Sequence, residues 1–103
     1  MEKLNNIVIK LIDRTRNGTL EWKHASKHTA MVHIATFGGV PVVVRHVKSW
    51  VKDPKYKSSL LIDRSEFIDY VDKDLFDELT SHLNKEAMIN IVDNLELKLE
   101  QND

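Results

Sequence analysis

The sequence contains no cysteine, only three glycines and two prolines, and no long apolar run among its 103 residues. The lack of cysteine excludes disulfides, thiolate metal sites and cysteine nucleophiles. The scarcity of glycine and proline argues against a linker or a long disordered segment, and a hydrophobic content of 42% suffices for one core. We therefore expect a single domain over residues 1–103, with a frayed tail at about residues 100–103.

Localisation signals are absent as well. No apolar stretch approaches the roughly 18 residues of a membrane span, and the N-terminus lacks the basic, apolar and small-residue regions of a signal peptide. We therefore expect a cytoplasmic protein without a membrane partner.

Charge is unevenly distributed along the chain. Residues 1–64 contain 12 Lys and Arg against 5 Asp and Glu, whereas residues 65–103 contain 3 against 11. The net charge of -1 therefore conceals a basic part of about +7 and an acidic part of about -8. Such a division favours charged partners or docking of one part on the other, and it is silent about fold.

The first sixteen residues have the apolar spacing of an amphipathic helix that runs to about Arg16. Asn17-Gly18 ends it, because both residue types tolerate the left-handed conformation of helix ends. Alternation over residues 19–23 then predicts a short strand with Leu20 and Trp22 on one face. The helical stripe consists of Leu4, Ile7, Val8, Leu11 and Ile12.

Residues 29–47 predict a β-hairpin around Gly38-Gly39. With these glycines as the turn, the numbers of paired residues sum to 77, so that Phe37 faces Val40. Because Pro41 lacks an N–H, a further strand is expected to pair nearer residues 46–51. Both hairpin faces are largely apolar, which predicts that both are covered. The cover is either helices divided between the two sides, or a second copy or partner protein on one side.

A strand over residues 58–62 completes a four-stranded antiparallel meander, and two helices follow. Ser65 is a candidate cap of the first helix, Asp72 caps an alternative later start, and Asn84 begins the second helix. The expected fold is α+β, with an N-terminal helix, the meander and two C-terminal helices packed on the sheet. The two C-terminal stripes are Phe67, Ile68, Val71, Leu75, Phe76, Leu79 and Leu83, and then Met88, Ile91, Val92, Leu95 and Leu99.

The segment Thr15-Arg16-Asn17-Gly18-Thr19-Leu20-Glu21-Trp22, with the helix before it, resembles the opening of many small uncharacterised bacterial and phage proteins. These begin with a helix and a T-x-x-G-x-L-x-W step into a strand, and the likeness covers residues 4–23. The pattern also has a structural reason, since a glycine ends the helix and Leu and Trp hold the strand against it. The resemblance implies a setting among accessory genes of mobile elements, and no activity or functional residue.

Four of the five histidines lie within 23 residues, at His24, His28, His33 and His46. Zinc takes neutral imidazoles, and His33 and His46 are diagonal neighbours on one predicted hairpin face. No carboxylate is predicted on that face, and His24 and His28 fall in or beside a turn. Packed or rim histidines are therefore the favoured interpretation, and neither a metal nor another cofactor is expected.

Residues 45–57 interleave basic residues with two aromatic rings. Cations for phosphates and flat rings for bases suit nucleic acid or an acidic partner. Against this, lysine at a strand edge is an ordinary defence against aggregation, and the tryptophan can fill the core. The candidate residues are Arg45, Lys48, Trp50, Lys52, Lys55, Tyr56 and Lys57.

An acidic cluster follows the last predicted strand. Three interpretations of this cluster are open: the solvated face of a helix, a surface that docks on the basic part of the chain, or a surface for a partner protein. The candidate residues are Glu66, Asp69, Asp72, Asp74, Asp77 and Glu78.

No glycine-rich phosphate loop, nucleophile elbow or acid–base pair around a histidine occurs, and we expect no enzymatic activity. The leading hypothesis is a non-enzymatic binding or regulatory protein that acts through protein–protein contacts. A phage or mobile-element inhibitor of a host factor is one form of it. The alternative is a nucleic-acid-binding protein that uses segment 45–57. The partner is an unidentified protein, a second copy or a nucleic acid.

Overall fold

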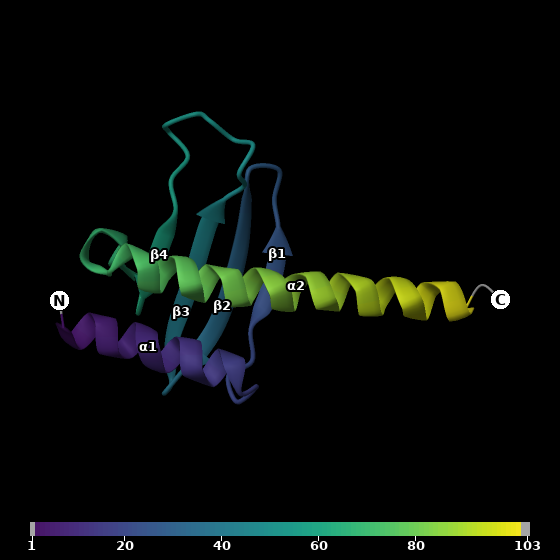
Figure 1. The fold of residues 1–103 in the computed structure, drawn as a ribbon, viewed down its shortest axis with the longest axis horizontal. Coiled ribbons are helices and arrows are strands. Elements are labelled where there is room, and N and C mark those ends of the chain that lie inside the picture. Colours follow the sequence, from purple (N-terminus) through teal and green to yellow (C-terminus); the bar gives the residue numbers. More distant parts are fainter. Residues whose placement is uncertain (1, 102–103) are drawn as a thin grey trace.

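The structure, a computed structural model, describes residues 2–101 and is an α+β fold with an antiparallel sheet. The strands lie side by side in chain order, β1-β2-β3-β4-β5, so the sheet is a meander (Figure 1). A single 3-10 turn, η1 (Ile68–Tyr70), leads into the last helix. The elements are α1 (Glu2–Arg16), β1 (Lys23–Ser26), β2 (Ala30–Phe37), β3 (Val40–Val47), β4 (Ser59–Ile62), β5 (Ser65–Glu66) and α2 (Lys73–Gln101).

Helix α1 and its ending agree with the sequence prediction. Gly18 adopts a φ of 75°, which only glycine adopts without strain, and the chain turns there. Trp22 then returns to the helix: its indole N–H donates to Thr15 Oγ1 at 2.9 Å, and the Thr15 hydroxyl donates to the Leu11 carbonyl at 2.6 Å. Buried on the helix are Leu4, Val8, Leu11, Ile12 and Thr15.

The central hairpin has the predicted register. Phe37 pairs with Val40 and His33 with Val44, as the sum of 77 requires. Gly38 and Gly39 have φ angles of 60° and 80°, the positive values of a two-residue turn whose twist matches that of the strands.

The position of β4 differs from the prediction. It pairs with residues 42–45 of β3, next to Pro41, and not with residues 46–51. Pro41 cannot donate a hydrogen bond, but its carbonyl accepts one from the Asp63 N–H at 2.9 Å. The proline therefore marks the end of this ladder without displacing the strand.

The sheet has five strands where the sequence predicted four. The first strand begins at Lys23, so Leu20 and Trp22 are buried but precede it. The additional strand β5 follows a turn at Asp63-Arg64, whose φ angles are 52° and 68°. Because the turn contains no glycine, the usual sequence signal for it is missing.

One long helix replaces the two predicted C-terminal helices. Asp72 is the cap, since its Oδ1 accepts the Asp74 N–H at 2.9 Å, whereas Ser65 lies in β5. Asn84 lies in the middle of α2 and begins no new helix. Residues 73–101 contain neither glycine nor proline, and a single asparagine costs a helix little, so nothing ends α2 early.

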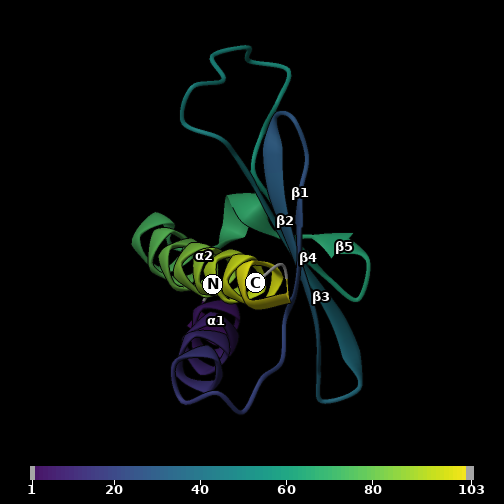
Figure 2. The ribbon, with the colours of Figure 1, turned by 90° about the vertical axis from the view of Figure 1, so that its right-hand side faces the viewer.

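Both helices lie on the same face of the sheet (Figure 2). The core forms between them and the inward side chains of β2, β3 and β4, among them Val42, Val44 and Leu60. The opposite face carries Ile34 and Val43, and no element within residues 2–101 covers it. The expectation that helices divide between the two faces is therefore wrong. Glu100 and Gln101 belong to α2, and the rest of the expected frayed tail, 102–103, lies outside the described residues.

Candidate protein-binding surface

Helix α2 consists of a packed half and a projecting half (Figure 1). It crosses the sheet from the side of β4 to β1 and then continues beyond β1. The buried residues of α2 end at Ala87, and every described residue from Met88 onward is exposed. We call residues 88–101 the projecting half of α2.

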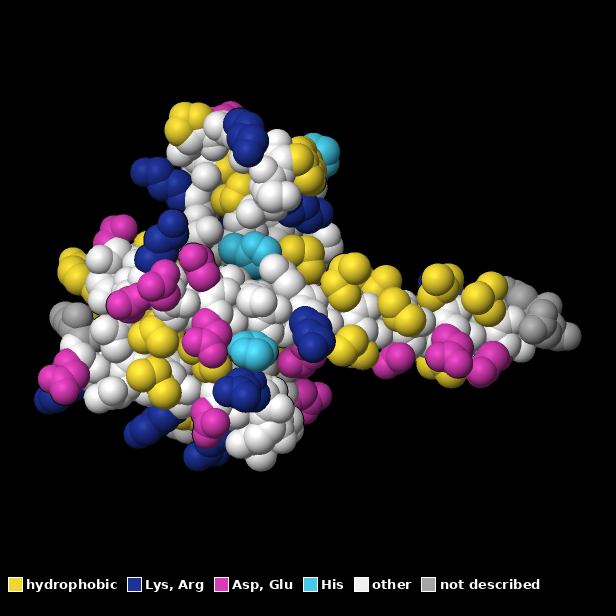
Figure 3. All heavy atoms as spheres, viewed as in Figure 1, with side chains coloured by type: hydrophobic (Ala, Val, Ile, Leu, Met, Phe, Trp, Pro, Cys, Tyr) yellow, Lys and Arg dark blue, Asp and Glu magenta, His cyan; other side chains and the backbone are white. Residues whose placement is uncertain are grey.

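The projecting half exposes large apolar side chains. Seven of them have 51–62% of their surface exposed. Five follow spacings of three and four and therefore share one side of the helix. Figure 3 shows apolar side chains along this half, with acidic groups gathered along one edge. The five, here named the α2 stripe, are Met88, Ile91, Val92, Leu95 and Leu99.

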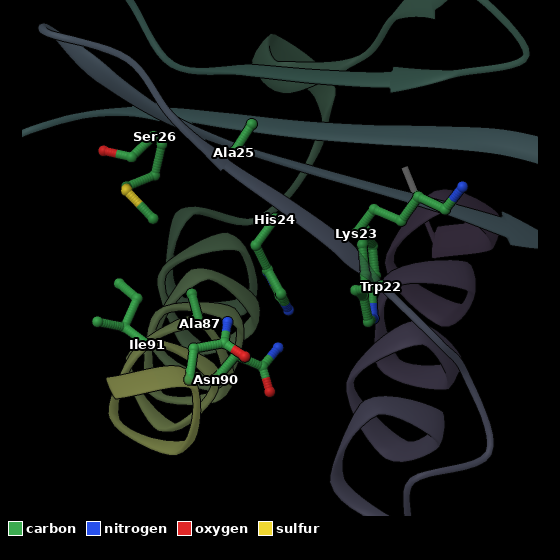
Figure 4. Close-up of a pocket in the computed structure, with 10 residues that line it drawn as sticks. Trp22, Lys23, His24, Ala25, Ser26, Ala87, Asn90 and Ile91 are labelled. Carbon is green, nitrogen blue, oxygen red and sulfur yellow. The ribbon is translucent and has the colours of Figure 1, made fainter. Parts of the chain in front are cut away.

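Two hollows lie where the projecting half begins. One, of about 450 Å³, lies between β1 and α2, and Ala87 and Ile91 line it from the helix (Figure 4). The other, of about 500 Å³, lies between Trp50 and Met88. Met31 lines both, so the hollows and the α2 stripe form one continuous surface.

Two polar contacts hold α2 to the sheet just before this point. The His24 Nε2 lies 3.2 Å from Glu86 Oε1, and the His46 Nε2 lies 2.7 Å from Asn84 Oδ1. Both acceptors are oxygens, so each imidazole donates an N–H. Neither partner was predicted, because Asn84 was expected at a helix start and Glu86 had no predicted neighbour.

His33 completes a cluster of three histidines under α2. It is fully buried, its Nδ1 lies 2.7 Å from His24 Nδ1, and its ring stacks on that of His46 at 5.6 Å. With neutral rings, His24 donates to Glu86 through Nε2 and accepts from His33 through Nδ1. His33 Nε2 is then left buried without a hydrogen-bond partner.

Burial lowers the pKa of His33 to about 4, with smaller contributions from His24 and His46, while Asn84 raises it slightly. His24 was expected in or beside a turn, but it lies in β1 directly opposite His33. Within residues 2–101, no three side chains of histidine, cysteine, aspartate or glutamate converge as metal ligands. The geometry describes a packed histidine cluster that fixes the position of α2.

Most of the predicted basic and aromatic residues lie on the loop 48–58 between β3 and β4, which projects beyond the sheet (Figure 1). Trp50 is 57% exposed and meets the ring of His28 edge-on at 5.1 Å, so it does not fill the core. Arg45 lies apart, exposed on β3. Exposed on the loop are also Lys52, Lys55 and Lys57.

Contacts of the loop cations are local. The Lys48 ammonium donates to Ser26 Oγ at 2.9 Å, and that of Lys55 lies 3.6 Å from Asp53 Oδ2. Lys55 also lies over the Tyr56 ring, 5.1 Å from its centroid. These contacts leave the loop with most of its positive charge.

The side chains of two residues in the predicted acidic cluster accept backbone hydrogen bonds, and within residues 2–101 those of the other four do not. Asp72 caps α2, and Glu66 Oε1 accepts three backbone N–H groups, from Leu60, Phe67 and Ile68, at 2.9–3.1 Å. Both residues therefore organise the backbone. The remaining members, exposed to solvent, are Asp69, Asp74, Asp77 and Glu78.

The basic and acidic parts of the chain do not neutralise each other. Among residues 2–101, the ion pair of a lysine or arginine is Lys55–Asp53, and two histidines, His82 and His24, lie within 4.0 Å of Glu78 and Glu86. None of them joins a lysine or arginine of the basic part to a carboxylate of the acidic part. The interpretation that the acidic cluster docks on the chain's own basic segment therefore finds no contact in the fold.

Comparison with known protein families, with curated proteins and with solved structures gives no match to this chain. Within the described part of the chain, neither helix combines the length and the apolarity of a membrane-spanning segment.

The exposure of the α2 stripe was missed by the sequence prediction, which found its residues but assigned them to the core. Helix length is the signal that reveals it. A helix of 29 residues is about 44 Å long, whereas five strands span only about 24 Å. Part of such a helix must extend past the sheet.

Proposed function

We propose that this protein is a non-enzymatic cytoplasmic binding protein that acts through protein–protein contacts, with the α2 stripe as its docking surface. One observation carries the proposal: the projecting half of α2 holds a regular apolar stripe on which nothing in the described chain packs. An apolar helix face is typically bound by another helix or by an apolar groove. Inhibition of a host factor is one form of this function, and it fits the setting among accessory genes of mobile elements that the N-terminal resemblance implies.

The size of the apolar surface supports this proposal. Soluble monomers seldom expose contiguous apolar patches above a few hundred Å². Here five large side chains, each more than half exposed, continue into two hollows that Met31 lines, one of them beside Trp50. Exposing such a surface to water is unfavourable, and the free energy of the system falls when another protein covers it.

Capture from an extract of the native host tests the proposal. The bait is the full chain, compared with the double variant Val92→Glu/Leu95→Glu and with the control Leu97→Glu. Leu97 is exposed to the same degree as Leu95 but lies outside the stripe. A differently tagged copy of this chain is added to the extract. We expect the wild type and the control to retain at least one protein, either this copy or a host protein, and the double variant to lose it. Equal capture by all three baits contradicts the proposal.

The loop 48–58 supports a second candidate function, nucleic-acid binding. Its lysines make no ion pair with the acidic part among the described residues, and Trp50 is available for stacking. This combination suits single strands, where cations contact phosphates and rings stack on bases.

A binding titration with short single-stranded RNA and DNA at two salt concentrations tests this candidate. Phosphate contacts predict an affinity that falls steeply with salt. The triple variant Lys52→Ala/Lys55→Ala/Lys57→Ala should weaken binding at least tenfold, while Lys3→Ala/Lys10→Ala on α1 should not change it. Absence of binding by the wild type at low salt eliminates this function.

A further inference from the structure

We infer that the occupant of the α2 stripe is a second copy of this chain, whose projecting half lies antiparallel along the first. The inference rests on the proposed function, because it identifies the partner of the same surface. It assigns the protein a symmetric dimer in which each copy gives one helix and receives one.

The spacing of the stripe suits a helix pair. The steps from Met88 to Val92, Leu95 and Leu99 are four, three and four residues, which is the alternation of coiled-coil core positions. In an antiparallel pair centred on the stripe, Met88 meets Leu99 of the other copy and Val92 meets Leu95. Large apolar side chains then face one another at all four levels.

The antiparallel direction follows from where the rest of the molecule lies. The body of the protein is at the N-terminal end of the projecting half (Figure 3), and Met31 and Trp50 line one hollow together with Met88 there. A parallel partner would bring a second body to the same end, where these side chains already occupy the space. An antiparallel partner places its body beyond the free end, about 16 Å along the helix.

The hollows give the end of the partner helix a place to lie. In the centred pairing, residues 99–101 of the second copy come alongside residues 86–88 of the first, at the two hollows. Met31, Ile91 and Trp50 then extend the contact beyond the helices. A standard stable interface buries about 800 Å² on each partner, and the contact at the hollows adds to the area that the stripe supplies.

Charge complementarity favours a second copy over an unrelated helix. In the centred pairing, Glu100 of the second copy comes level with Ala87 of the first, at the hollow that Lys48 and Met88 line. A carboxylate of the acidic part is thereby brought to the end of the helix where a lysine of the basic part lies, and the two-fold symmetry repeats this arrangement. The division of charge along the sequence is what such a self-complementary interface uses.

Light scattering on the purified full chain tests the inference. The wild type and the control Leu97→Glu should have twice the 12.0 kDa mass of one chain. Leu95→Glu should be monomeric, with a dimer dissociation constant raised at least a hundredfold, and its circular dichroism should match the control. A wild type that is monomeric at several hundred micromolar, or a control that dissociates equally, overturns the inference.

The direction of the pair is tested by disulfide trapping, for which this cysteine-free chain has no background. Met88→Cys and Leu99→Cys are prepared as separate chains, mixed in equal amounts and mildly oxidised. The antiparallel dimer predicts a mixed disulfide between the two variants. Predominant disulfides within each variant alone indicate a parallel pair and overturn the inference.

The two proposals fail in different ways. A monomeric wild type that still captures another protein through the α2 stripe overturns the second copy as occupant and leaves the proposed function intact. If the stripe variant affects neither self-association nor capture, the α2 stripe is not a protein-binding surface, and both proposals fall.

Discussion

The two halves of α2 have similar spacings of apolar residues and opposite surroundings. Both repeat large apolar residues at spacings of three and four, yet Leu79 and Leu83 are fully buried while Leu95 and Leu99 are more than half exposed. The packed half lies on the sheet beside α1, and the projecting half begins where the sheet ends. Periodicity therefore identifies the apolar side of a helix, and the dimensions of the neighbouring elements decide whether that side is covered.

The largest difference between the halves should appear in stability. Leu79→Ala should lower the free energy of unfolding by about 3 kcal/mol, because it leaves a cavity in a fully packed site. Leu95→Ala should change it by less than about 0.5 kcal/mol when the chain is monomeric, because no contact is lost. Urea unfolding at low micromolar concentration measures both. Similar losses for the two variants would mean that the projecting half packs on its own body.

The histidine cluster at the boundary of the halves should make stability sensitive to acid. The pKa of His33 is about 4 in the fold and 6.5 in an unfolded chain, so below pH 6.5 the unfolded state binds a proton that the folded state does not. Stability should therefore fall between pH 6.5 and 4, by at most about 3 kcal/mol from this group.

Unfolding curves of the wild type and His33→Gln across this range measure the effect. The variant should lose less stability toward acid than the wild type, since it removes the proton-binding group. His28→Gln, at an exposed histidine, serves as the control and should follow the wild type. Parallel curves for wild type and His33→Gln would show that His33 does not contribute.

A smaller effect is expected at the start of the packed half. Asp72→Ala removes the side-chain acceptor of the Asp74 N–H and should cost about 1 kcal/mol. Asp72→Asn keeps an acceptor and should cost less. The same unfolding assay separates the two variants, and equal losses would argue that charge near the helix end, more than the cap itself, stabilises α2.

The smallest expected difference between the two halves of α2 is in the free energy of local opening, which amide hydrogen exchange measures. In a dilute monomer, amides of residues 88–101 should exchange faster than those of residues 76–87, because a helix without tertiary contacts opens easily. At high concentration the proposed dimer should slow them. Equally slow exchange in both halves at every concentration contradicts the comparison.

Features that depend on neighbouring residues alone could be predicted from the sequence. The register of the central hairpin followed from Gly38-Gly39, and the end of α1 followed from Gly18, because positive φ angles are encoded in single residues. The turn at Asp63-Arg64 was not predicted, because its positive φ angles occur at two residues that are not glycine. The helix break expected at Asn84 relied on a weak signal, and an uninterrupted run of helix-tolerant residues outweighed it.

The candidate site required information that local patterns lack. The α2 stripe was found residue by residue, but its exposure depends on the width of the sheet. The contacts of His24 with Glu86 and of His46 with Asn84 join residues 62 and 38 positions apart, and no spacing in the sequence encodes them. The basic and aromatic segment 45–57 was found from its composition, while its position on a loop that projects from the sheet emerged only with the fold.

The hydrogen bond from the Trp22 indole to Thr15 joins the first and last letters of the T-x-x-G-x-L-x-W pattern. Between them, Gly18 reverses the chain so that the ring returns to the helix it has just left. The residues of the pattern thus hold the end of α1 against the segment that follows it. Thr15→Val should remove the hydrogen bond from the Trp22 indole, whereas Thr15→Ser should keep it. Other chains that carry this pattern should therefore share the way in which their first helix meets the sheet.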